Sequence, residues 1–69
     1  MANIKFKDYH GDEHVFKLED IYDVDTEKNY KGDTCYYVEY FENDYRKHVR
    51  VDKTTYFDIW EKAYYNHLI

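Results

Sequence analysis

The segment that most constrains the fold covers residues 34–52, where two β-rich runs are separated by only two residues. The runs are 34–42 and 45–52, and Asn43-Asp44 stands between them. Asparagine and aspartate both tolerate left-handed backbone angles, so this pair suits the tight turn of a two-residue hairpin. We therefore predict an antiparallel hairpin that turns at Asn43-Asp44.

The turn fixes the register of this hairpin, because Glu42 then faces Tyr45 and every later pair follows in step. One face is expected in the core: Tyr36, Val38 and Tyr40 opposite Val51, Val49 and Lys47. On the other face, aromatic side chains lie opposite arginines and an acidic side chain lies opposite a histidine. These pairs are Tyr37 opposite Arg50, Phe41 opposite Arg46, and Glu39 opposite His48. Such cross-strand pairs contribute roughly 0.2–1 kcal/mol each and suit a face in contact with water.

Two earlier strands are expected at residues 3–9 and 13–18, where apolar and polar side chains alternate. Gly11 can take a positive φ, so the residues between these strands form a turn. The side chains expected to share an apolar face are Ile4 and Phe6 in the first strand, and His14, Phe16 and Leu18 in the second.

Residues 21–27 are a weaker strand candidate, in which Tyr22 and Val24 would face one way. The aspartates in this segment are poor strand formers, so a short helical turn at residues 19–23 is the alternative. Residues 28–33 are expected to form a loop.

The last element is a predicted helix with Thr54 or Thr55 as its N-cap, and Asp58 completes a capping box with Thr55. We expect Trp60 to anchor the helix on the sheet, so that its removal costs about 3–5 kcal/mol. Tyr65 is expected to point outward. The apolar stripe consists of Tyr56, Ile59, Trp60, Ala63 and His67, widened by Phe57, Tyr64 and Leu68, with Tyr64 expected in the core.

These elements predict an α+β fold in a single domain at residues 1–69. The expected architecture is a small antiparallel β-sheet of four to five strands with one C-terminal α-helix packed on one face. A lone helix covers only one face of a sheet, so the other face is left to water or to a partner.

Composition favours a binding protein. Ten of the 69 residues are tyrosine, more than the core of so small a domain needs. Some rings must therefore lie on the surface, where tyrosine is favoured at interfaces. The formal net charge of −5 argues against a generic nucleic-acid binder and permits a partner with a basic groove.

The sequence also bears on where the protein resides. Cys35 is the one cysteine, which suggests a reducing compartment, most simply the cytoplasm. No apolar run approaches the roughly 18 residues of a membrane span, and the N-terminus lacks the apolar stretch of a signal peptide. We expect no membrane association.

Two groups of residues are the candidate partner-binding sites. The first is a strip on the free hairpin face: Tyr37, Phe41, Arg46, His48 and Arg50. Aromatics with arginine are typical of binding hot spots and of stacking platforms for single-stranded nucleic acid. The alternatives are that this face packs a second copy of the chain, or that the register is shifted by one and the rings are core.

The second group is an acidic run, made of Glu19, Asp20, Asp23, Asp25 and Glu27. Its ordinary interpretation is a solvated edge or loop. The functional interpretation is that the run imitates a row of nucleic-acid phosphates and docks into a basic channel.

No catalytic, metal or cofactor site can be assembled from the sequence. His10 and His14 invite a metal hypothesis, but no second ligand pair follows at a familiar spacing. In the predicted register Cys35 and His48 lie roughly 13 Å apart at strand rise, too far for proton transfer. We therefore expect a chain that is not an enzyme and that binds no metal or cofactor.

In size, acidity and absence of a catalytic motif, the chain resembles the small phage-encoded inhibitors of bacterial enzymes, such as anti-CRISPR proteins and uracil-DNA glycosylase inhibitors. The resemblance covers the general type of chain and assigns no role to any residue. The leading hypothesis is a non-enzymatic inhibitor that occludes a protein partner, such as a nucleic-acid-processing enzyme with a basic groove. The alternatives are a nucleic-acid-binding module that uses the aromatic and arginine face, and a structural homodimer.

Overall fold

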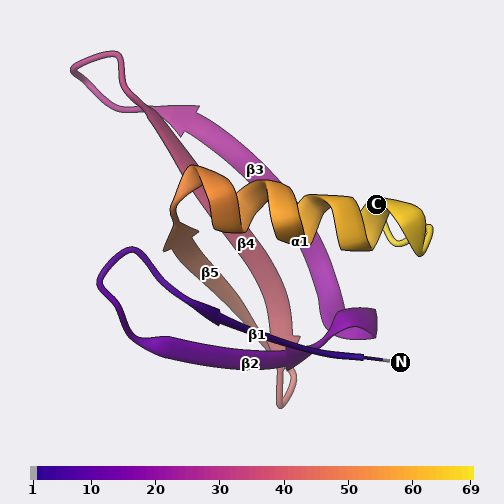
Figure 1. Cartoon of the computed structure of the whole chain (residues 1–69). Helices are drawn as coiled ribbons and strands as arrows, with labels where there is room; N and C mark the ends of the chain where they lie inside the picture. The colour runs from indigo at the N-terminus through magenta and orange to yellow at the C-terminus, as the bar shows by residue number, and fades with distance from the viewer. Residues whose placement is uncertain (1) are drawn as a thin grey trace.

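The computed structural model describes residues 2–69 and contains five strands, one 3-10 turn and one α-helix (Figure 1). The elements are β1 (Asn3–Lys7), β2 (Glu13–Lys17), η1 (Leu18–Asp20), β3 (Ile21–Lys28), β4 (Thr34–Glu42), β5 (Tyr45–Val51) and α1 (Lys53–Tyr65). All strand pairs are antiparallel. The α+β class is thus confirmed.

The five strands form two sheets rather than the one that we predicted. β1 pairs with β2 alone, and the second sheet has the order β3-β4-β5. The β1–β2 hairpin and α1 lie on the same face of the three-stranded sheet (Figure 1). The hairpin turns its apolar face onto this sheet, and the Phe16 ring stacks on Tyr40 with ring centroids 4.5 Å apart. A hairpin that packs face to face in this way cannot also extend the sheet at its edge.

One core lies between the three-stranded sheet and the two elements that cover it. It consists of Ile4, Phe6, Phe16, Leu18, Ile21, Val24, Val38, Tyr40, Val51, Ile59 and Ala63. The alternation predicted for the first two strands is confirmed, because Ile4, Phe6 and Phe16 are all buried.

The predicted central hairpin is confirmed in its turn and its register. Asn43 and Asp44 have φ values of 51° and 69°, the left-handed angles that a two-residue turn requires. Glu42 pairs with Tyr45, and the ladder continues to Tyr36 opposite Val51. On the expected core face, Val38, Tyr40 and Val51 are buried and Tyr36 and Val49 are partly buried, whereas Lys47 is exposed because this end of β5 extends past the core.

Residues 18–28 contain both of the alternatives that the sequence left open. A 3-10 turn at Leu18–Asp20 leads directly into strand β3. The register of β3 against β4 shifts between Ile21 and Asp23, and the extra residue is Tyr22. Val24 is buried, whereas Tyr22 is exposed and meets Phe41 edge-on at 5.5 Å. The prediction that Tyr22 and Val24 share a face is wrong, because a β-bulge reverses the alternation at that point.

The helix begins two or three residues earlier than its threonines suggested. Asp52, directly after β5, is the N-cap, and its side chain accepts a hydrogen bond from the backbone N–H of Thr55 at 2.8 Å. The predicted cap at Thr54 or Thr55 is therefore wrong. Asp58 instead pairs with Lys62 one turn later, with Oδ2 and Nζ 3.1 Å apart.

Ile59 and Ala63 anchor α1, and Trp60 does not. Ile59 and Ala63 are 1% and 0% exposed, while Trp60 is 38% exposed and stacks on Tyr64 at 5.1 Å. One residue corresponds to about 100° around a helix, so Trp60 turns onto the flank once Ile59 faces the sheet. The predictions that Trp60 is the anchor and that Tyr64 is core are wrong. Tyr65 points outward as predicted.

Candidate binding surface

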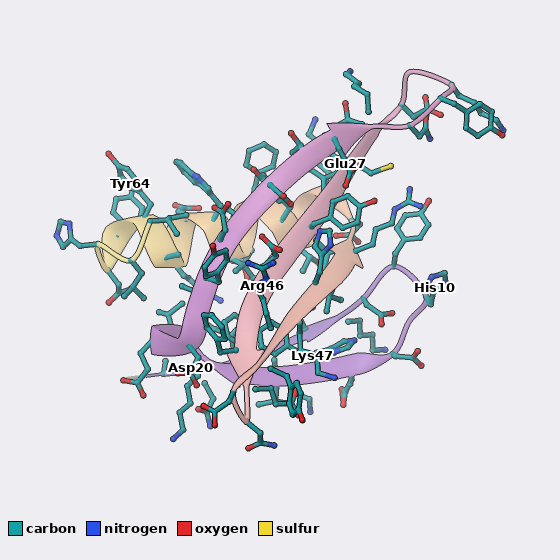
Figure 2. All side chains as sticks on the ribbon, turned by 180° about the vertical axis from the view of Figure 1, so that it is seen from behind. His10, Asp20, Glu27, Arg46, Lys47 and Tyr64 are labelled. Atoms are coloured by element: carbon teal, nitrogen blue, oxygen red, sulfur yellow. The ribbon has the colours of Figure 1, made fainter. Side chains whose placement is uncertain are left out.

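The face of the three-stranded sheet that points away from α1 and the β1–β2 hairpin is the candidate site. Figure 2 views this face directly, with β3, β4 and β5 in front of the helix and hairpin. Within residues 2–69 no element lies over it. We call it the outer face, and its side chains are Tyr22, Asp23, Asp25, Glu27, Cys35, Tyr37, Glu39, Phe41, Arg46, His48 and Arg50.

One end of the outer face is an aromatic and cationic cluster that joins all three strands. The Arg46 guanidinium lies over the Tyr22 ring, with Cζ 4.9 Å from the centroid (Figure 2). Tyr22 meets Phe41 edge-on, and Phe41 is 41% exposed. Arg46 Nε also lies 3.9 Å from Glu39 Oε1. Two of these residues were expected here from the sequence, and the bulge adds Tyr22.

The middle of the outer face is built around His48. Its ring packs against Tyr37 with centroids 4.5 Å apart, and Nε2 lies 3.8 Å from Asp25 Oδ1. Desolvation raises the pKa of the Tyr37 hydroxyl, and the nearby charges of Glu27 and Cys35 add to this. The phenol is therefore a hydrogen-bond donor at any physiological pH.

The far end is formed by Arg50 and by Tyr9, a residue that sequence reasoning missed. The Arg50 guanidinium lies over the Tyr9 ring at 3.8 Å, and the Tyr9 N–H donates to the Arg50 carbonyl at 2.8 Å. Arg50 Nε is buried and has no hydrogen-bond partner among the described residues. The two residues are far apart in the chain and meet because the β1–β2 hairpin folds over the end of β5. No local pattern in the sequence signals such a contact.

The acidic run is divided between a strand and a turn. Asp23, Asp25 and Glu27 form a row on the outer face of β3, opposite Glu39, Tyr37 and Cys35 of β4. Glu19 and Asp20 precede them in η1. Figure 2 shows Asp20 and Glu27 at opposite ends of β3. The structure thus brings part of the acidic run and the aromatic strip together on one surface, which the sequence treated as two separate candidates.

Two of the residues considered for catalysis or metal binding, His14 and Cys35, are bound or buried within the fold. His14 Nε2 donates to Asp8 Oδ2 at 2.8 Å, because an ionised carboxylate can only accept. His14 Nδ1 lies 3.2 Å from the hydroxyl of Tyr40, which is 1% exposed and so out of reach of a substrate. Cys35 is a buried free thiol. Among residues 2–69 no group of three or more potential ligands is placed to hold a metal ion.

Comparison with family models, with curated proteins and with solved structures gives no match. In the part of the chain that the structure describes, α1 is neither long nor apolar enough to cross a membrane.

Proposed function

We propose that this chain is a small non-enzymatic binding protein that attaches to a protein partner through the outer face. The observation that carries the proposal is the composition of that face together with its openness. Tyr22, Phe41 and Arg46 are exposed on it, and no element of residues 2–69 covers it. Tyr37 and Arg50 are partly buried on the same face. Aromatic residues and arginine are enriched at protein interfaces, and rigid rings lose little entropy on binding.

The kind of partner follows from the charge on this surface. The outer face carries four carboxylates, on Asp23, Asp25, Glu27 and Glu39, against two guanidinium groups, on Arg46 and Arg50. Both guanidinium groups lie over tyrosine rings of the same chain. The surface therefore presents net negative charge, and the whole chain carries −5. Such a surface suits a partner with a basic groove and accelerates association with it.

A nucleic-acid-processing enzyme is the partner class that fits best, and occlusion of its groove would make the chain an inhibitor. Side chains two positions apart on β3 are about 6.8 Å apart along the strand, twice the axial charge spacing of one strand of B-DNA. The row Asp23, Asp25 and Glu27 can therefore present charge at every second phosphate position of such a strand.

The test is capture of partners from a bacterial lysate by the immobilised protein at low and at high salt. We expect a nucleic-acid enzyme that the wild type retains, that Phe41→Ala loses, and that high salt weakens. Tyr65→Ala, a change on the exposed side of α1, is the matched control and should retain it. The proposal would be refuted if Phe41→Ala retained the same partner as well as the wild type, or if neither salt concentration gave specific capture.

A second function is a nucleic-acid-binding module, favoured by the tyrosine rings that lie against arginines on the outer face. In this case Tyr37 and Arg50 would contact bases and phosphates on the outer face. Fluorescence anisotropy with labelled single strands separates the two functions. Salt-sensitive binding that Arg50→Ala abolishes would favour the module, and no binding at tens of micromolar protein would exclude it.

A further inference from the structure

The free edge of β5 carries backbone groups that point away from the sheet. The Arg50 carbonyl accepts from Tyr9, so it faces away from β4. In an antiparallel ladder, pairs that exchange backbone hydrogen bonds alternate with pairs that do not. The N–H and C=O groups of His48 and Arg46, two and four residues before Arg50, therefore also face away from β4. Within residues 2–69 no hydrogen bond reaches these groups.

The turn of the hairpin agrees with this assignment. Counting back from Arg50, the pair formed by Glu42 and Tyr45 is one that exchanges hydrogen bonds. This is the pair that closes the turn at Asn43-Asp44, and a two-residue turn is closed by such a pair.

The opposite edge of the same sheet, on β3, is protected at one position. The same alternation makes the Val24 N–H of β3 face away from β4. The side chain of Asp23 covers it, because Oδ1 accepts from this N–H at 2.8 Å. Charged groups that blunt an edge in this way prevent added strands. Among the described residues, the β3 edge is thus blunted at Val24, and the outward groups of Arg46 and His48 on the β5 edge carry no such cap.

A cationic depression lies beside the open edge. Its volume is about 380 Å³, and it is lined by Asp8, His10 and His14 of the hairpin and by Lys47, His48, Val49 and Arg50 of β5. Figure 2 shows His10 at the hairpin turn and Lys47 on β5, on the same side of the molecule. The single carboxylate in this lining, Asp8, is already bound to His14. Apart from Val49, the other side chains of the lining are cations and imidazoles.

We propose that the β5 edge binds an extended acidic segment of a protein partner by strand addition. The segment would pair with the outward backbone groups of Arg46 and His48 and place its carboxylates beside Lys47 and His10. This inference rests on the proposed binding function and names a second, backbone-mediated contact for it.

A second copy of this chain fits the edge poorly. Two antiparallel β5 strands paired about His48 would place Arg46 of each copy opposite Arg50 of the other, and like charges in facing positions destabilise a ladder. The acidic strand β3 of a second copy presents its edge with Val24 already capped by Asp23. Charge complementarity therefore selects an acidic segment from outside the chain.

The probe is a fluorescent peptide, acetylated and amidated, of the repeating sequence Glu-Val-Glu-Val-Glu-Val-Glu. Anisotropy against the intact protein at low salt should show saturable binding. His48→Pro should weaken peptide binding by about tenfold or more, because proline lacks the outward N–H and its ring clashes with the incoming strand. A tenfold loss of affinity corresponds to about 1.4 kcal/mol. His48→Ala, which keeps the N–H, should stay within about threefold of the wild type, a loss of under 1 kcal/mol.

Amide hydrogen exchange of the wild-type protein provides a measurement that needs no substitution. Addition of the peptide should slow exchange at Arg46 and His48 and leave Lys47 and Val49 unchanged, because the last two amides already face β4. No slowing at Arg46 and His48 under saturating peptide would overturn the proposal. Equal binding of the peptide with lysine in place of glutamate, or light scattering that shows a dimer which the acidic peptide does not dissociate, would also overturn it.

The two proposals fail separately. Phe41 lies on β4 opposite Arg46, one strand in from the free edge, and its truncation leaves the outward backbone groups of Arg46 and His48 in place. Phe41→Ala should therefore leave peptide binding unchanged while it abolishes lysate capture. Loss of peptide binding in Phe41→Ala would contradict the edge proposal, whereas loss of peptide binding in His48→Pro but not in His48→Ala would support it.

Discussion

The Asp8 carboxylate and the His14 imidazole lie 2.8 Å apart, and through the other imidazole nitrogen this pair reaches the buried hydroxyl of Tyr40. Asp8 also accepts through Oδ1 from the backbone N–H groups of His10 and Asp12. The pair therefore stabilises the β1–β2 turn and ties the hairpin to β4 of the other sheet.

Acid should loosen this connection. The hydrogen bond from His14 lowers the pKa of Asp8 below its ordinary value of 3.8 despite partial desolvation, and the N–H groups of Asp12 and His10 act in the same direction. A carboxyl with a lowered folded-state pKa stabilises the fold fully above its unfolded pKa and loses that contribution as pH falls through the folded value. Thermal unfolding between about pH 2.5 and 6 should show the loss below about pH 4.

In Asp8→Asn this part of the pH dependence should be absent. Asp12→Asn is the matched control, because no described hydrogen bond involves the Asp12 side chain. Unchanged acid sensitivity in Asp8→Asn would show that other carboxyls dominate.

Truncation of Ile59 should destabilise the protein more than truncation of Trp60. Ile59→Ala removes a buried side chain between α1 and the sheet, at a cost of about 2–5 kcal/mol. Trp60→Ala loses a partly exposed ring and its stacking on Tyr64, worth about 0.5–1.5 kcal/mol. Urea unfolding of both variants makes the comparison, and the opposite order would restore Trp60 as the anchor.

Removal of the Asp52 side chain should weaken the helix cap, whereas removal of the Thr54 side chain should not. Asp52→Ala leaves the Thr55 N–H without its partner and should cost about 0.5–2 kcal/mol of unfolding free energy. The backbone and side-chain hydrogen bonds from Thr55 lower the pKa of Asp52. The cap is thus strongest above about pH 4 and weakens in more acidic solution as its carboxyl is protonated. Thr54→Ala, measured in the same denaturant series, should stay near the wild type.

The turn at Asn43-Asp44 can be tested with a pair of substitutions at one position. Asp44 has a φ of 69°, an angle that costs a branched residue about 1–2 kcal/mol. Asp44→Val should therefore lower the unfolding free energy, and Asp44→Gly should preserve or raise it. Equal stability of the two variants would contradict the left-handed geometry.

Local patterns predicted the parts of this fold that depend on neighbouring residues. The turn at Asn43-Asp44 required left-handed angles, and its length then fixed every pair between β4 and β5. The placement of Tyr37, Phe41, Arg46, His48 and Arg50 on one open face followed from that register.

Other errors arise from contacts between distant parts of the chain. Helical periodicity marked Trp60 and Ile59 alike as apolar, and only the fit of Ile59 against the sheet decided which faces inward. The bulge at Tyr22 has no glycine to signal it. The contact between Tyr9 and Arg50 exists because the β1–β2 hairpin packs across the face of the three-stranded sheet. Whether the hairpin packs on that face or extends an edge of the sheet depends on the packing of the whole core.

The hydrogen bond from Tyr9 to Arg50 also sets a limit on how any foreign chain can align with β5. Because this hydrogen bond occupies the Arg50 carbonyl, the accessible edge of β5 runs from Tyr45 to Val49, about 17 Å at strand rise. A ligand longer than about five residues must bend away where the hairpin turn begins. Selectivity would then come from a handful of positions, and lengthening the ligand beyond them would add no backbone bonds.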